Sequence, residues 1–165
     1  MNAMSPDGHD ALYAFDATLH RMPDAVPPGP PHVDAWGTWP TLAAGHARAV
    51  VPFSIGLDDA FARLDRLDRM FTEPDGSFVW TSPREGLSWQ VDGNAFEKDG
   101  RLLLVDLKGS CPADAFDRLL FAIGWPAEPV MLQLVKPAVF LDEATFRRHA
   151  AARGAAGDGE TLRPR

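Results

Sequence analysis

The sequence predicts a single α/β domain in which a mixed β-sheet is flanked by helices. Its 165 residues are 45% hydrophobic and 24% charged, which is the balance of one compact globular domain. Segments with strand alternation stand between segments with helical spacing. Residues 130–135 form an apolar run, interrupted only by Gln133, that suits a buried central or parallel strand.

The first 49 residues form an N-terminal extension that is rich in turn formers and aromatic residues. Residues 12–19 alternate in a way that fits a strand, although a short helix also fits. Prolines dominate residues 23–31, which predicts an extended loop. Residues 36–40 form an aromatic loop that we expect to pack over the core as a lid.

The core domain, residues 50–152, contains a first helix that begins after Gly56. Asp58 and Asp59 occupy its first turn, where the helix dipole favours negative charge. Five apolar residues recur at helical spacing and predict one buried face, namely Leu57, Phe61, Leu64, Leu67 and Phe71.

Three strands are predicted after this helix, at residues 78–80, 87–96 and 101–108. Lys98, Asp99 and Gly100 separate the last two strands and are typical of a hairpin turn. These strands therefore form a sheet whose register depends on the length of that turn.

A second helix follows Pro112 and ends at Gly124, and the apolar strand at residues 130–135 comes next. A last helix covers residues 142–151 and precedes a flexible tail at residues 153–165. From the apolar faces of these elements we expect burial of Phe61, Leu64, Leu104, Phe116, Leu119, Leu120 and Leu132.

Three charged residues on the predicted hairpin are the candidates for chemistry: Asp92, Asp106 and Lys108. Asp106 and Lys108 point to the same face because side chains alternate along a strand. A three-residue loop at residues 98–100 would place Asp92 directly opposite Asp106. A two-residue turn would instead turn Asp92 to the other face unless a bulge, for example at Gly93, restored the register.

Two carboxylates that face each other repel, and a hard cation such as Mg²⁺ relieves this repulsion through oxygen ligands. Asp92 and Asp106 are the expected metal ligands. The backbone carbonyl of Leu107, which follows Asp106 on the strand, is a plausible further ligand. Mn²⁺ is the alternative ion. A bound metal can activate water for phosphodiester hydrolysis, and Lys108 can stabilise the negative charge that develops.

An acidic residue on one strand followed by (D/E)-x-K on the next resembles the signature of the PD-(D/E)XK nuclease superfamily. The signature is seen here in Val91-Asp92-Gly93 and Asp106-Leu107-Lys108. The predicted order over residues 57–136, helix-strand-strand-strand-helix-strand, is similar to the restriction-endonuclease-like core of that family. The resemblance implies a metal-dependent nuclease that acts on DNA, or less readily on RNA.

The sequence also departs from the family pattern. Family members commonly carry an acidic residue on the first helix, and Asp65, Asp68 and Glu73 are all candidates for it. No proline precedes Asp92.

Two other functions fit the same sequence. The first is a catalytically inactive nuclease-like protein that binds a partner, as an antitoxin-type protein or a complex-assembly subunit. The net charge of −7 favours it, because broad contact with phosphates needs a basic surface. The second is an α/β domain unrelated to nucleases, with Asp106 and Lys108 on a solvated strand face.

Composition also bears on location and on other kinds of site. No apolar run approaches the ~20 residues of a membrane helix, and the N-terminus lacks the features of a signal peptide, so we expect a cytoplasmic protein without membrane contact. Cys111 is the only cysteine, which excludes an intrachain disulfide and leaves a buried thiol as the expected state. Four histidines lack metal-ligand spacing: His9, His20, His32 and His46.

Overall fold

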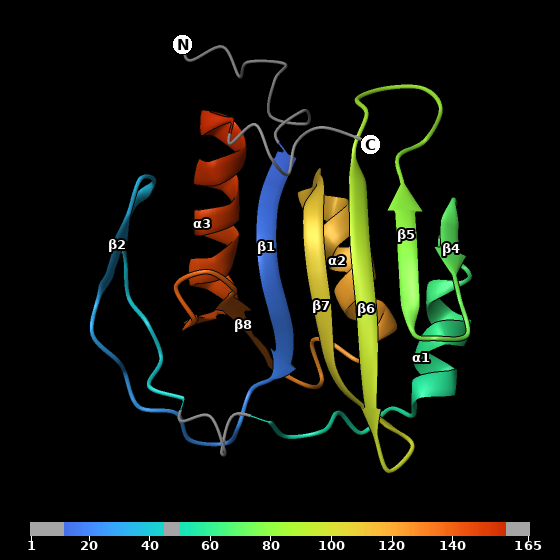
Figure 1. Cartoon of the computed structure of the whole chain (residues 1–165), viewed down its shortest axis with the longest axis horizontal. Helices are drawn as coiled ribbons and strands as arrows, with labels where there is room; N and C mark the ends of the chain where they lie inside the picture. Colours follow the sequence, from blue (N-terminus) through green and yellow to red (C-terminus); the bar gives the residue numbers. More distant parts are fainter. Residues whose placement is uncertain (1–11, 45–49, 158–165) are drawn as a thin grey trace.

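The computed structural model describes residues 12–44 and 50–157 and forms a single α/β domain (Figure 1). His9, His46 and the end of the predicted tail lie outside the described residues. The elements in chain order are β1 (Leu12–Arg21), β2 (His32–Asp34), β3 (Gly37–Trp39), α1 (Leu57–Leu64), β4 (Met70–Thr72), β5 (Ser77–Thr81), β6 (Gln90–Lys98), β7 (Arg101–Pro112), α2 (Ala113–Ala122), β8 (Val130–Leu134), β9 (Val139–Asp142) and α3 (Glu143–Ala156).

Seven strands form one sheet in the order β4-β5-β6-β7-β1-β8-β9, and β2 and β3 form a separate hairpin. The prediction of a mixed sheet was wrong, because every strand pair in residues 12–44 and 50–157 is antiparallel. The sheet is antiparallel at its centre because β1 lies between β7 and β8 and pairs antiparallel with both. The strand expected at residues 12–19 is therefore central to the sheet.

The first helix is shorter than predicted. Helix α1 ends at Leu64, and Phe71 lies in the additional strand β4 instead of on the helix. Arg69 has a positive φ of 61°, a conformation that a right-handed helix cannot contain. Helix α3 begins at the expected place, because the Asp142 side chain accepts a hydrogen bond from the Thr145 backbone N–H at 2.7 Å.

The main core lies on the sheet face that packs against α1, α2 and α3, here called the inner face. Figure 1 shows α2 behind β6 and β7. Rings of Phe15, Phe116 and Phe146 meet there, with centroids 5.6–6.1 Å apart. Cys111 is buried in the same core, and burial raises the pKa of its thiol, as expected for a structural cysteine.

The predicted core residues are mostly buried on this inner face. Phe61 and Leu104 are the exceptions, since both are only half-buried. Leu104 pairs with His20 and Phe96, so it lies on the opposite face of the sheet. The fully buried members of the predicted set are Leu64, Phe116, Leu119, Leu120 and Leu132.

Within residues 12–44 and 50–157, the opposite face of the sheet, here called the outer face, is covered at one end only. Leu42 donates its backbone N–H to the Phe140 carbonyl at 2.8 Å and packs over Phe140 and Met131. No helix in the described part of the chain is both long and apolar enough to span a membrane.

Candidate functional site

The β6–β7 hairpin brings the three predicted residues to one face by a route other than the expected one. The turn has two residues, Asp99 and Gly100, both with positive φ, so Lys98 pairs with Arg101. The predicted three-residue loop is therefore not formed. A bulge between Phe96 and Glu97 then shifts the register by one residue.

Beyond this bulge, Asp92 pairs with Lys108 and Asn94 pairs with Asp106. The predicted direct pairing of Asp92 with Asp106 was thus wrong, and the two carboxylates are diagonal neighbours. All three predicted residues nevertheless share the outer face, because the bulge compensates for the shorter turn.

Strand β1 adds two residues to this group. Asp16 pairs with Lys108, and Thr18 pairs with Asp106 and donates its hydroxyl to that carboxylate at 2.8 Å. The resulting concavity, which we call the acidic hollow, has a volume of about 390 Å³. Its polar lining consists of Asp16, Thr18, Asp92, Asn94, Asp106 and Lys108.

Two carboxylates of the acidic hollow have other polar neighbours within the chain. Lys108 stands between Asp92 and Asp16, and Gln90 donates to Asp92 at 2.8 Å, so these carboxylates already have cationic or donor neighbours. Among the residues that the structure describes, no group of three or more His, Cys, Asp or Glu side chains is placed to hold a metal ion.

The acidic residues proposed for the first helix lie elsewhere. Asp65 accepts a hydrogen bond from the Thr72 hydroxyl at 2.5 Å, and Glu73 lines a different concavity beside α1. Neither these two residues nor Asp68 line the acidic hollow. Asp16, which the sequence did not single out, occupies the place of a third carboxylate there.

A second hollow adjoins the first and shares Thr18 and Asp106 with it. It has a volume of about 430 Å³ and is also lined by His20 and Gln133. His20 is 4% exposed, and Gln133 is its polar neighbour in this hollow. Burial lowers the pKa of His20, while the nearby Asp106 and Gln133 act in the opposite direction.

Exposed apolar side chains lie in the same cross-strand rows as residues that line the two hollows. Phe71 and Val79 continue the cross-strand row that contains Asp92, and Phe96 continues the row that contains Leu104. Phe71 is 60% exposed, Phe96 42% and Val79 38%. We call these three residues the open apolar set.

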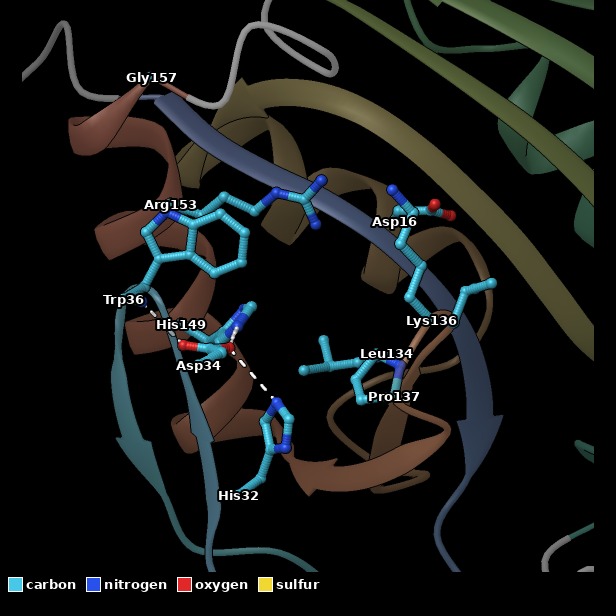
Figure 2. Close-up of a pocket in the computed structure, with 11 residues that line it drawn as sticks. Asp16, His32, Asp34, Trp36, Leu134, Lys136, Pro137, His149, Arg153 and Gly157 are labelled. Atoms are coloured by element: carbon cyan, nitrogen blue, oxygen red, sulfur yellow. Dashed lines mark hydrogen bonds and ion pairs between the residues drawn. The ribbon is translucent and has the colours of Figure 1, made fainter.

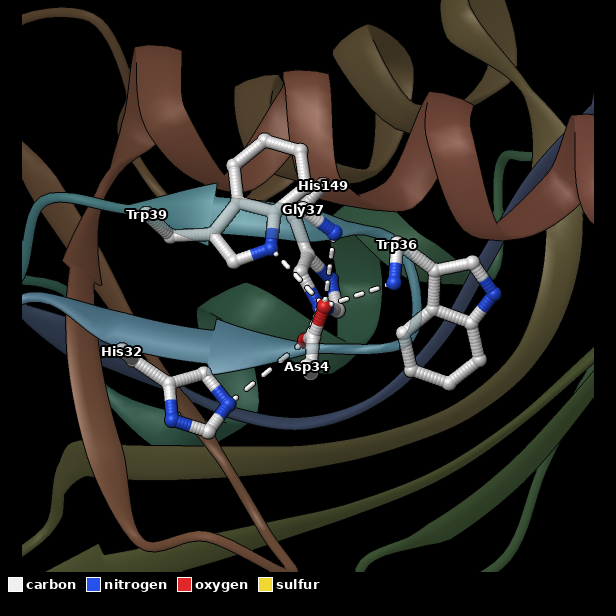
Figure 3. A network of polar contacts seen from close by, with 6 residues as sticks. All are labelled: His32, Asp34, Trp36, Gly37, Trp39 and His149. Carbon is white, nitrogen blue, oxygen red and sulfur yellow. Dashed lines mark hydrogen bonds and ion pairs between the residues drawn. The ribbon is translucent and has the colours of Figure 1, made fainter.

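A third site, which sequence reasoning missed, lies between α3 and the β2–β3 hairpin. Asp34 sits at the hairpin turn, and its Oδ1 accepts hydrogen bonds from the Trp36 and Gly37 backbone N–H groups and the Trp39 indole N–H, at 2.9–3.1 Å (Figure 3). Its Oδ2 lies 2.8 Å from Nε2 of His149 and 3.5 Å from Nε2 of His32. The aromatic loop expected over the core is this hairpin.

Burial and hydrogen bonding together set the direction of the pKa shifts of Asp34 and His149. Burial acts to raise the pKa of Asp34, but hydrogen bonds from Trp39, His149 and Trp36 outweigh it and hold that pKa below its ordinary value. Burial lowers the pKa of His149, more than Asp34 raises it. At neutral pH the pair is therefore a carboxylate and a neutral imidazole, with the proton of the imidazole on Nε2.

Comparisons with known proteins leave the family open. No family model matches the chain, and neither the curated proteins nor the solved structures give a match. In its described residues the chain is an α/β domain with an antiparallel sheet and three helices, and the outer face of that sheet carries a group of polar residues.

Proposed function

We propose that this protein is a non-catalytic binding protein that docks a basic protein partner on its outer sheet face. One observation carries the proposal: the open apolar set and the acidic hollow lie on the same face of the sheet. Scattered apolar residues are ordinary on protein surfaces, but exposed apolar side chains bordered by polar residues on one face are typical of interaction sites.

The chemistry of the face selects the kind of partner. Asp16, Asp92 and Asp106 contribute three carboxylates, and Lys108 contributes one cation, so this area has an excess of negative charge. The whole chain has a net charge of −7, which steers basic molecules toward it. The matching surface therefore presents lysine or arginine next to apolar side chains.

Selection from random peptides tests this proposal, because it lets the surface itself choose its ligand. The full chain is immobilised and a displayed library of short random peptides is selected against it. We expect enriched peptides to combine Lys or Arg with apolar residues, and their binding to weaken as salt is raised. Enrichment of peptides without a basic bias would overturn the proposal.

Two matched charge-reversal variants test whether the peptides bind on the outer face. The double variant Asp92→Lys/Asp106→Lys should lose the enriched peptides. The control Asp58→Lys/Asp59→Lys changes the net charge equally but alters exposed residues of α1, and should keep them. Equal loss in both variants would mean that net charge alone attracts the peptides. Self-association of the chain through this face would replace the partner with a second copy.

A metal-dependent nuclease is the second candidate, and a specific observation favours it. Asp92, Asp106 and Lys108 line one hollow on an accessible face, as the resemblance implies. Calorimetric titration with Mg²⁺ and Mn²⁺, together with cleavage of labelled DNA and RNA, decides this candidate. Saturable metal binding and cleavage that Asp106→Asn abolishes would establish the nuclease and overturn the non-catalytic proposal.

A further inference from the structure

The site between the β2–β3 hairpin and α3 is a pocket with a volume of about 450 Å³, which is within the range of small-molecule sites (Figure 2). Four separate parts of the chain line it, and Asp16 of β1 belongs to one of them. Trp36 comes from the hairpin, Arg153 from α3, and Leu134 and Pro137 from the end of β8 and the turn after it. We call it the arm pocket.

The wall of the arm pocket that contains Asp34 is held in place by the chain itself. The carboxylate accepts three N–H hydrogen bonds and contacts His149, which is 1% exposed. The rings of Trp36 and Trp39 pack against His149 with centroids 5.5 and 5.0 Å away. The negative charge of Asp34 is thus already balanced by hydrogen bonds within the pocket wall.

Cationic side chains occupy other parts of the lining. The guanidinium carbon of Arg153 lies 5.1 Å from the centroid of the Trp36 ring, which holds the group along the pocket wall, and Arg153 is 8% exposed. Lys136 stands in the exposed turn between β8 and β9. Both cations have contacts within the chain, and Asp16 also lines the pocket. His32 adds a further nitrogen donor or acceptor near Asp34.

From this lining we propose that the arm pocket binds a small organic anion, with its carboxylate or phosphate at Arg153 and Lys136. A planar guanidinium matches the geometry of both anionic groups, and an ammonium adds a second donor. The apolar or aromatic body of the ligand lies between the Trp36 ring and the aliphatic surface of Leu134 and Pro137. The arm pocket shares Asp16 with the acidic hollow, but Arg153 and Lys136 do not line that hollow, so either proposal can fail alone.

A panel of aromatic probes with one shape and different charges tests the anion requirement. Benzoate and phenyl phosphate are compared with the neutral benzamide and benzyl alcohol and the cationic benzylamine. We expect saturation-transfer NMR signals for at least one of the anions and a shift of the Trp36 indole N–H resonance, assigned with Trp36→Phe. Binding of the neutral or cationic probes as tight as that of the anions would overturn the proposal, as would no binding by any probe.

The Lys136→Met variant tests the position of the anion without disturbing a buried residue. It should weaken anion binding by roughly tenfold or more, which is the effect of one lost charged hydrogen bond. Lys98→Met removes the same charge from the exposed end of β6 and should leave binding unchanged. Equal affinity in wild type and Lys136→Met, or equal weakening in both variants, would contradict this placement.

Discussion

The two ends of the outer sheet face carry similar apolar side chains but differ in what covers them. At the β8–β9 end, Phe140 is 4% exposed and Met131 is fully buried, because Met22, Leu42 and Ala44 pack over them. At the β4–β6 end, Phe71 is 60% exposed. The chain thus uses its own segment after the hairpin to cover one end.

This difference explains why we place binding at the open end. When a second surface covers an exposed phenylalanine and excludes water from it, the complex is stabilised by ~25 cal/mol per Å² of apolar area buried. At the β8–β9 end, Leu42 already supplies that surface through a backbone hydrogen bond and side-chain packing. At the β4–β6 end, a partner that buries the exposed apolar side chains would obtain this stabilisation.

The largest expected effect contrasts one phenylalanine from each end. Phe140→Ala should reduce the free energy of unfolding by ~3–5 kcal/mol, since it leaves a cavity beneath Leu42. Phe71→Ala should change it by no more than ~0.5 kcal/mol, because the ring is mostly solvated. Chemical denaturation of both variants measures this. Similar losses in both would show that the open end is also packed in solution.

A second contrast compares the Asp34 carboxylate, which accepts several hydrogen bonds, with the exposed carboxylate of Asp106. Asp34→Asn should destabilise the fold by ~1.5–3 kcal/mol, because the amide replaces a charged acceptor of several hydrogen bonds. Asp106→Asn removes the charge from an exposed residue with one hydroxyl donor, so we expect a loss below ~1 kcal/mol. Thermal melts of the two variants give the comparison, and a larger loss for Asp106→Asn would contradict it.

The smallest effect concerns acid stability. Burial lowers the folded-state pKa of His20 and of His149 below their ordinary value of 6.5, so the unfolded chain binds protons first as the pH falls. Their contribution to stability is therefore complete above about pH 6.5 and is lost as the pH falls below it.

Denaturation at about pH 7.5 and about pH 5.5 checks this window. Wild type should be less stable at the lower pH, and the double variant His20→Asn/His149→Asn should show a smaller difference between the two. Asp34 does not contribute in this window, because its lowered pKa confines its effect to pH values below about 3.8. An unchanged difference in the double variant would assign the acid sensitivity to other groups.

Local pattern predicted much of the fold. Helical spacing located α1 and α2, and the turn residues located the β6–β7 hairpin. The place of β1 between β7 and β8 was beyond local pattern, because it depends on which distant strands pair. That single placement made the sheet antiparallel and brought Asp16 and Thr18 to the predicted residues.

The candidate sites likewise combine features that local pattern predicts with features that depend on contacts between distant residues. Alternation placed Asp106 and Lys108 on one face, but the Phe96/Glu97 bulge that returns Asp92 to that face leaves no distinct mark in the sequence. The pairing of Asp34 with His149 joins residues 115 positions apart, so no spacing rule could indicate it. An Asp in front of an aromatic hairpin turn was the only local signal.

Mapping a bound peptide by NMR tests the central claim most directly. A selected basic peptide is titrated into the isotope-labelled full chain, and shifts of the backbone amides are followed. We predict that the largest changes fall on β5, β6 and β7, around Val79, Asp92 and Asp106. Changes confined to α1 and α2, or to the covered end around Leu42 and Phe140, would contradict the claim that the open end of the outer face is the binding surface.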